Sequence, residues 1–190
     1  MTRERDGTSE GGFTVVEVVV ALGLVSAVIV SLGVFFSSSI GTSRYQSQTQ
    51  AATRLAEEGV ERGRGLGGAA LLAGRNTCGT CADVSSFAAG YLAEMVRWDA
   101  RVTAATTGVP YTDQPDAIVV DGTTFQRYWI VGKCWQAAAG GACTTNATLA
   151  IPMVRLVVAV VWGDPSCSAN QCVRASTGLV SNVPVEPVFP

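Results

Sequence analysis

The sequence contains no histidine and a single lysine, Lys133. Without imidazole, the chain cannot build a histidine-based catalytic triad, use a histidine as general base or bind a metal through histidine. The 13 basic and 15 acidic residues give a net charge of −2. This balance supplies no overall positive field for nucleic acid, so we expect nucleic acid to be at most an indirect partner. A chain of 190 residues has room for one globular domain and an appendage.

Charge is also missing from a long stretch near the N-terminus. Residues Val18–Phe36 read VVVALGLVSAVIVSLGVFF, and the wider segment 13–40 contains one charged residue, Glu17. About 20 apolar residues cross the hydrocarbon core of a bilayer as a helix, so we expect one transmembrane helix here. A secretory signal has a shorter apolar region, of about 7–15 residues, after a net positive start. The long run and its mixed-charge start therefore predict an anchor.

Glu17 is unusual because it is a carboxylate in a segment otherwise suited to lipid. A charge at the membrane centre costs roughly 2.5–3.5 kcal/mol on insertion scales, and less near the interface. Two interpretations follow. Either Glu17 lies at the level of the headgroups and needs no partner, or it meets a positive group that another molecule supplies.

The residues around Glu17 carry a family resemblance. Residues 12–17 read GFTVVE, and together with the apolar run they resemble the cleavage and methylation motif of type IV prepilins. The resemblance implies that a prepilin peptidase cuts between Gly12 and Phe13 and methylates the new amino group of Phe13. Segment 1–12 is then the leader peptide, although it is less basic than is common in that family. Glu17 becomes the fifth residue of the mature chain, where the family has its glutamate.

The resemblance also implies an assembly mechanism and a set of partners. Helices 13–40 of neighbouring subunits pack side by side, and Glu17 of one subunit neutralises the Phe13 amine of the next, so that one pair replaces two isolated charges. The implied partners are prepilin peptidase, other pilin subunits, the inner-membrane assembly platform and, before assembly, membrane lipid. The chain would be a single-pass inner-membrane protein with a cytoplasmic leader and an extracytoplasmic domain, and then part of a pilus at the cell surface. Pilus priming or tip function, type II secretion and competence DNA uptake remain alternative roles.

After the apolar segment, residues 41–63 show a helical period with one apolar side. The glycines between Gly63 and Gly68 are expected to end this helix. The whole segment 13–63 predicts either one long helix or two helices with a break near 37–42. The residues on the apolar side are Tyr45, Ala52, Leu55, Ala56, Gly59 and Val60.

The remaining residues predict a small antiparallel sheet over 117–183. Strands are expected at 118–120 and 123–135 with a tight turn at Asp121-Gly122 between them, and at 153–162 and 172–181. The helix 41–63 would cover the apolar face of the sheet, which gives an α+β fold of pilin-like type with a globular domain at 41–190. Segment 64–116, which lies between this helix and the sheet in the sequence, is expected to be a variable loop region. Within it, residues 91–102 fit a helix and a strand equally well.

The six cysteines permit several interpretations. The Cys78-x-x-Cys81 spacing is that of a thiol redox motif, but such a motif expects a preceding strand and a helix that opens at the first cysteine. A zinc site would need four thiolates from distant loops, because there is no histidine. An even number of cysteines outside the cytoplasm favours disulfides. Proximity in the sequence favours the pairs Cys134–Cys143 and Cys167–Cys172, and Cys78 and Cys81 are then left to pair with each other. Six cysteines allow many other pairings, so this assignment rests on proximity alone.

Other motifs are weaker. Asn146-Ala147-Thr148 matches the N-glycosylation acceptor pattern, which has meaning only in a host with that machinery. Asp113, Asp116, Asp121 and Asp164 lie beside glycine, proline or threonine, where they are expected to form turns. No nucleophile, base and oxyanion donor come together, so we expect no catalytic residue, cofactor or metal site. The alternative of a different class is a single-pass anchored enzyme or thiol redox protein, with an uncut N-terminus and reactive thiols at Cys78 and Cys81.

Overall fold

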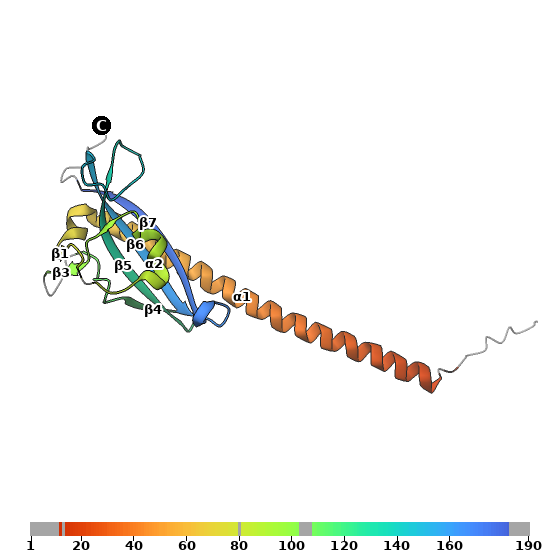
Figure 1. Cartoon of the computed structure of the whole chain (residues 1–190). Coiled ribbons are helices and arrows are strands. Elements are labelled where there is room, and N and C mark those ends of the chain that lie inside the picture. The colour runs from red at the N-terminus through yellow and green to blue at the C-terminus, as the bar shows by residue number, and fades with distance from the viewer. Residues whose placement is uncertain (1–11, 13, 80, 103–107, 183–190) are drawn as a thin grey trace, which may run out of the picture. The chain divides into compact units, whose positions relative to one another are not determined.

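The computed structural model describes residues 12, 14–79, 81–102 and 108–182 (Figure 1). The chain divides into two compact units, Met1–Arg44 and Tyr45–Pro190. Helix α1, Val15–Leu72, contributes residues to both units. Its backbone is helical through 37–42, so the alternative of a break at that point is wrong.

Helix α1 is interrupted at Gly67, inside the glycine segment that was expected to end it. The backbone there has φ 77° and ψ 161°, and a short further helical piece continues to Leu72. Gly59 and Gly63 are buried against the sheet. A Cβ at Gly59 would lie 2.7 Å from Cγ1 of Val158, and one at Gly63 would overlap the side chain of Leu156. These glycines therefore allow the helix to approach the sheet closely, and this packing outweighs their low helix propensity.

The main sheet is antiparallel and contains five strands in the order β2-β5-β6-β7, with β4 also paired to β5. The expected turn at Asp121-Gly122 joins β4 to β5, and both residues have positive φ, 49° and 76°, as a two-residue hairpin turn requires. The strands are β2 Val96–Arg97, β4 Asp116–Val120, β5 Thr123–Gln136, β6 Ile151–Gly163 and β7 Gln171–Ser181.

The region 64–116, which we expected to be a variable loop, contains in its described residues the end of α1, four complete elements and the first residue of β4. Helix α2, Ser85–Leu92, packs on the main sheet, and strand β2 pairs with β5 at its edge. Strands β1, Arg75–Asn76, and β3, Ala100–Arg101, form a separate two-stranded sheet. The ambiguous segment 91–102 thus holds the end of α2 followed by two short strands, so both local patterns were present.

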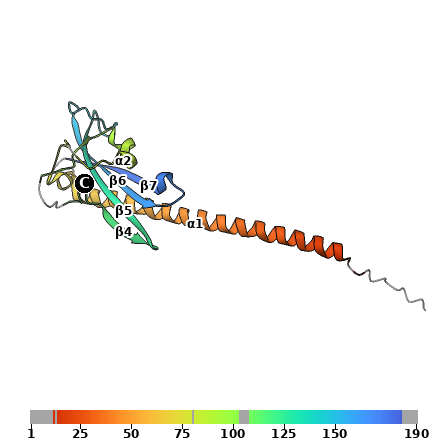
Figure 2. The same ribbon diagram turned by 60° about the horizontal axis from the view of Figure 1, so that its bottom comes forward.

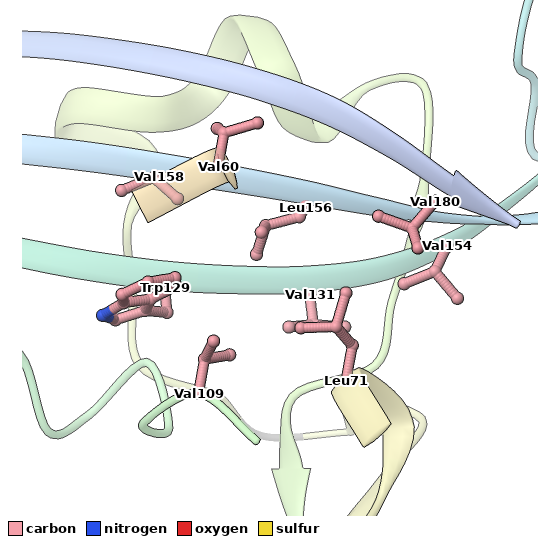
Figure 3. Close-up of a cluster of buried hydrophobic side chains, with 9 residues drawn as sticks. All are labelled: Val60, Leu71, Val109, Trp129, Val131, Val154, Leu156, Val158 and Val180. Carbon is pink, nitrogen blue, oxygen red and sulfur yellow. The ribbon is translucent and has the colours of Figure 1, made fainter. Parts of the chain in front are cut away.

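In the unit Tyr45–Pro190, the two helices cover opposite faces of the main sheet (Figures 1 and 2). Val158 of β6 lies in the cluster on the α1 face, whereas Val157 packs with Ala88 of α2 on the other face. Figure 3 shows the α1-face cluster, to which α1 contributes Val60 and Leu71. Alternation along β6 therefore places apolar side chains on both faces, and the structure is an α+β fold with its sheet between two helical layers.

Candidate functional site

The first candidate site is the apolar half of α1. The helix is long and apolar enough to cross a membrane once, and none of its apolar window is buried. Large apolar side chains along it are strongly exposed, for example Val15 at 80%, Phe35 at 64% and Ile40 at 69%. A surface of this kind in water would be unfavourable at about 25 cal/mol per Å² of apolar area, so it requires lipid or protein around it.

Thr14 caps the N-terminus of α1. The backbone N–H of Glu17 donates to the carbonyl oxygen of Thr14 at 3.0 Å and lies 3.3 Å from its Oγ1. The N–H of Val18 donates to the same carbonyl at 3.2 Å. Threonine at the cap with glutamate three residues later is the pattern of a capping box. The cap therefore fixes Glu17 in the first turn, where a negative charge suits the positive end of the helix dipole.

The residues of the expected cleavage junction lie directly before this cap. Gly12 is exposed and outside the helix, and Phe13 lies outside the described residues. Glu17 is exposed, and within the described part of the chain its carboxylate has no hydrogen-bond or ion-pair partner. A medium of low polarity would therefore demand a positive partner for Glu17 from elsewhere.

Three hydroxyl groups along this part of α1 are satisfied within the helix itself. Ser26 and Ser31 donate to the carbonyl oxygens of Leu22 and Ala27, four residues earlier, both at 2.8 Å. Thr42 donates in the same way to Ser38 at 3.1 Å. Such bonds remove the cost of placing a hydroxyl in an apolar environment. Glu17, the single charged residue of segment 13–40, has no such bond within the helix and requires a partner from elsewhere.

All six cysteines are paired, as Cys78–Cys81, Cys134–Cys143 and Cys167–Cys172. These are the pairs that proximity in the sequence favoured. The last two close the connections between β5 and β6 and between β6 and β7. The Cys78–Cys81 pair lies in the loop after β1, and α2 begins only at Ser85. The first cysteine therefore does not open a helix, in contrast to the thioredoxin arrangement.

A buried ion cluster ties the region before β4 to the sheet. The carboxylate of Asp99 accepts hydrogen bonds from Arg75 at 3.2 Å, from Arg97 at 3.3 Å and from the backbone N–H of Val131 at 2.9 Å. Burial raises the pKa of Asp99, and the Val131 N–H and the two arginines oppose this change. Arg75 also donates to the carbonyl oxygen of Val109 at 2.6 Å. This cluster could not be predicted from the sequence, because its members are distant along the chain and share no motif.

Asp116 corrects one of the sequence predictions. It was expected to form a turn, but it lies in β4, where its Oδ2 accepts from Arg127 at 3.1 Å and from the indole Nε1 of Trp129 at 3.0 Å. Arg127 is buried and also lies 3.8 Å from the carboxylate of Glu58 in α1. The polar contacts of these residues connect β4, β5 and α1, so we assign Asp116 and Arg127 a role in stabilising the fold.

The described residues contain no group of three or more cysteine, aspartate or glutamate side chains arranged to hold a metal ion. An open hollow of about 450 Å³ lies between α1 and the turn that joins β4 to β5. Its charged lining residues are Arg54, Glu58 and Asp121, beside the apolar Leu55 and Val120. The lining thus combines side chains of both charge signs with apolar surface.

Comparisons of the chain with protein-family models, with curated proteins and with solved structures found no match. The function is therefore inferred from the residues and contacts described above.

Proposed function

We propose that the chain is a structural subunit, a minor pilin or pseudopilin, of a type IV pilus-like filament. A prepilin peptidase removes residues 1–12 and methylates Phe13, and the subunit enters the filament through the helix that begins there. Its globular part, residues 41–190, then faces outward and contacts neighbouring subunits or other molecules. In this account the fold is pilin-like, with the second half of α1 against the antiparallel sheet.

The observation that carries this proposal is the place of Glu17. It is the single charged residue of segment 13–40 and lies in the first turn of an exposed apolar helix, directly after the Gly12–Phe13 junction. An ordinary membrane anchor has no need of a carboxylate at that point. Cleavage gives the first residue of this helix an ammonium group, and a carboxylate in the first turn can neutralise that charge on a neighbouring subunit.

The assembly step follows from this pairing. In lipid, the Phe13 ammonium and Glu17 both lie near the headgroups, where an isolated charge is least costly. When a subunit leaves the bilayer for the filament, its apolar side chains exchange lipid for neighbouring helices and both charges lose their water. The pairing of Glu17 with the Phe13 amine of the adjacent subunit then offsets part of that desolvation cost and sets the axial register.

The proposal also places the globular domain outside the cytoplasm. Three disulfides are present in the structure, and disulfides persist mainly in oxidising compartments. The implied route is a single pass through the inner membrane with the leader on the cytoplasmic side, followed by a position in a pilus at the cell surface. The implied partners are prepilin peptidase, other pilin subunits and the assembly platform.

Type II secretion and competence DNA uptake are alternative settings for the same subunit. Direct DNA binding would favour clustered cations with aromatic side chains between them. Four arginines of the globular part form ion pairs within it instead: Arg75 and Arg97 with Asp99, Arg101 with Asp113, and Arg155 with Glu94. Nucleic acid therefore remains at most an indirect partner in this proposal.

Intact-mass analysis of the membrane-bound chain, from cells with an active prepilin peptidase, tests the proposal. We expect a chain that lacks residues 1–12 and carries one additional methyl group on Phe13. The matched control is Gly12→Val, which should leave the chain at full length because the cleaved junction is altered. A full-length wild-type chain in such cells contradicts the proposal and favours the single-pass anchored enzyme or thiol redox protein.

A further inference from the structure

The connection between β5 and β6 carries a motif that the proposed function does not use. Asn146-Ala147-Thr148 has the pattern of an N-glycosylation acceptor, in which the residue between asparagine and threonine is not proline. Elsewhere in the sequence, no asparagine is followed two positions later by serine or threonine. All residues from Thr144 to Thr148 are exposed. The motif therefore lies where an enzyme can reach it.

The side chains of Asn146 and Thr148 are in direct contact. Oδ1 of Asn146 accepts hydrogen bonds from the backbone N–H of Thr148 at 3.1 Å and from its hydroxyl at 2.8 Å. In a planar carboxamide Nδ2 lies on the other side of Cγ from Oδ1, so Nδ2 is directed away from Thr148. Donors at Oδ1 stabilise the negative charge that develops there as Nδ2 gives up a proton, so they make it easier to deprotonate Nδ2 during its attack. The hydroxyl of Thr148, at the third position of the motif, thus assists the loss of the Nδ2 proton.

The base of this loop is fixed. The disulfide Cys134–Cys143 joins its two sides, and Trp135 and Thr144 exchange backbone hydrogen bonds at 2.8 and 3.0 Å. The N–H of Asn146 also lies 3.3 Å from Oγ1 of Thr144. The acceptor side chain is therefore presented from an anchored turn close to the end of the sheet.

We propose that Asn146 is the acceptor for an N-linked glycan. In the transfer, Nδ2 attacks the anomeric carbon of a saccharide that is activated as its diphosphate ester. The new Nδ2–C1 bond forms as the C1–O bond to the diphosphate breaks, the diphosphate leaves with the electron pair, and the proton of Nδ2 passes to a base of the transferring enzyme. This inference rests on the proposed function in one respect, since transfer outside the cytoplasm requires the domain 41–190 to be there.

Asn170 provides a matched internal control. It is exposed and lies in the connection between β6 and β7, which is also closed by a disulfide. The residue two positions later is Cys172, which is bonded to Cys167 and is 2% exposed. No hydroxyl stands at that place, so Asn170 should remain unmodified.

The test is peptide and intact-mass analysis of the full chain, purified from the membranes of the organism that produces it naturally. We expect the peptide with Asn146 to be heavier by one or more sugar residues, and enzymatic release of the glycan in H₂¹⁸O to leave labelled aspartate at position 146. Thr148→Ser should keep the modification because it keeps the hydroxyl. Thr148→Val and Asn146→Gln should abolish it, whereas the Asn170 peptide stays unmodified in all variants.

The same spectra separate this inference from the proposed function. An unmodified Asn146 in a chain that has lost residues 1–12 and is methylated at Phe13 overturns the inference and leaves the proposed function intact. A glycosylated Asn146 in a full-length chain supports the inference and contradicts the proposed function. Modification that persists in Thr148→Val also overturns the inference, because it removes the role assigned to the hydroxyl.

Discussion

The indole N–H of Trp129 donates to the carboxylate of Asp116 at 3.0 Å, and Trp129 is fully buried. The same carboxylate oxygen accepts from Arg127, which is itself buried. One acid in β4 thus satisfies two buried donors from β5. Since an unsatisfied buried donor costs more than a lost exposed contact, this carboxylate should contribute strongly to the stability of the globular part.

Asp116→Ala should lower the free energy of unfolding by about 2–3 kcal/mol, because it leaves the buried indole N–H of Trp129 without its acceptor and removes the carboxylate partner of Arg127 in β4. The measurement is urea unfolding of the detergent-solubilised chain, followed by tryptophan fluorescence. Asp113→Ala is the matched control, since Asp113 pairs with Arg101 at 2.9 Å on the exposed surface. Surface pairs contribute roughly 0–1 kcal/mol, so equal losses in the two variants would contradict the structural role of Asp116.

Gly63→Ala should destabilise the packing of α1 against the sheet, because the added methyl group would overlap the side chain of Leu156. Overpacking of this kind typically costs about 1–3 kcal/mol. Gly65→Ala is the control on the same helix, where an added Cβ meets nothing within 4 Å. That variant should be more stable than the wild type by roughly 0.5–1 kcal/mol, because alanine has the higher helix propensity. Thermal unfolding monitored by circular dichroism compares them, and stabilisation by both substitutions would contradict the close approach.

Acid should weaken α2 through Asp83. The N–H and hydroxyl of Ser85 donate to this carboxylate and lower its pKa. A carboxyl whose pKa is lower in the folded state adds stability above its unfolded pKa, and loses this contribution as the pH falls through the folded value. The stability difference between wild type and Asp83→Ala should therefore be present at neutral pH and vanish in strong acid. Unfolding measured across that pH range tests this, and a difference that grows towards low pH would contradict it.

The three disulfides should differ in their access to reductant. Both sulfur-bearing residues of Cys134–Cys143 are buried, with 0% and 9% exposed, whereas Cys78 and Cys81 are both half-buried. Thiol–disulfide exchange requires access to a sulfur atom, so Cys78–Cys81 should be reduced before Cys134–Cys143 in the folded chain. Brief treatment with a phosphine, alkylation and peptide mass analysis should label Cys78 and Cys81 before Cys134 and Cys143. Equal labelling of these two pairs would contradict the burial described here.

The sequence predicted the parts of the fold that depend on local patterns. The helical period of Leu55 and Val60 gave the buried side of α1, and Asp121-Gly122 gave the hairpin turn. It failed where a distant contact decides the structure. The expected interruption among the glycines occurs at Gly67, but the close packing of Gly63 on Leu156 was not predicted, because Leu156 is far away in the sequence. Asp99 and Arg75 form a buried pair across 24 positions and showed no signal at all.

The candidate assembly site depends even more on local sequence. Thr14 and Glu17 are neighbours on the first turn of α1, so the sequence alone placed the acid at the start of the apolar helix. A partner for Glu17 could not be predicted in the same way, since in the proposal it belongs to another subunit. The disulfides could be predicted from proximity in the sequence, because the two cysteines of each pair are at most nine positions apart.

The central claim is that Glu17 pairs with the Phe13 amine of a neighbouring subunit. Its most direct test is the amount of Glu17→Gln in isolated filaments compared with the membrane fraction, in cells that make the peptidase and the other subunits. Ser26→Ala is the control, because the hydroxyl of Ser26 is satisfied within its own helix. We predict that Glu17→Gln is inserted and cut normally but is at least about tenfold depleted from filaments, which corresponds to a loss of roughly 1.4 kcal/mol. Incorporation of Glu17→Gln at the level of Ser26→Ala would contradict the account.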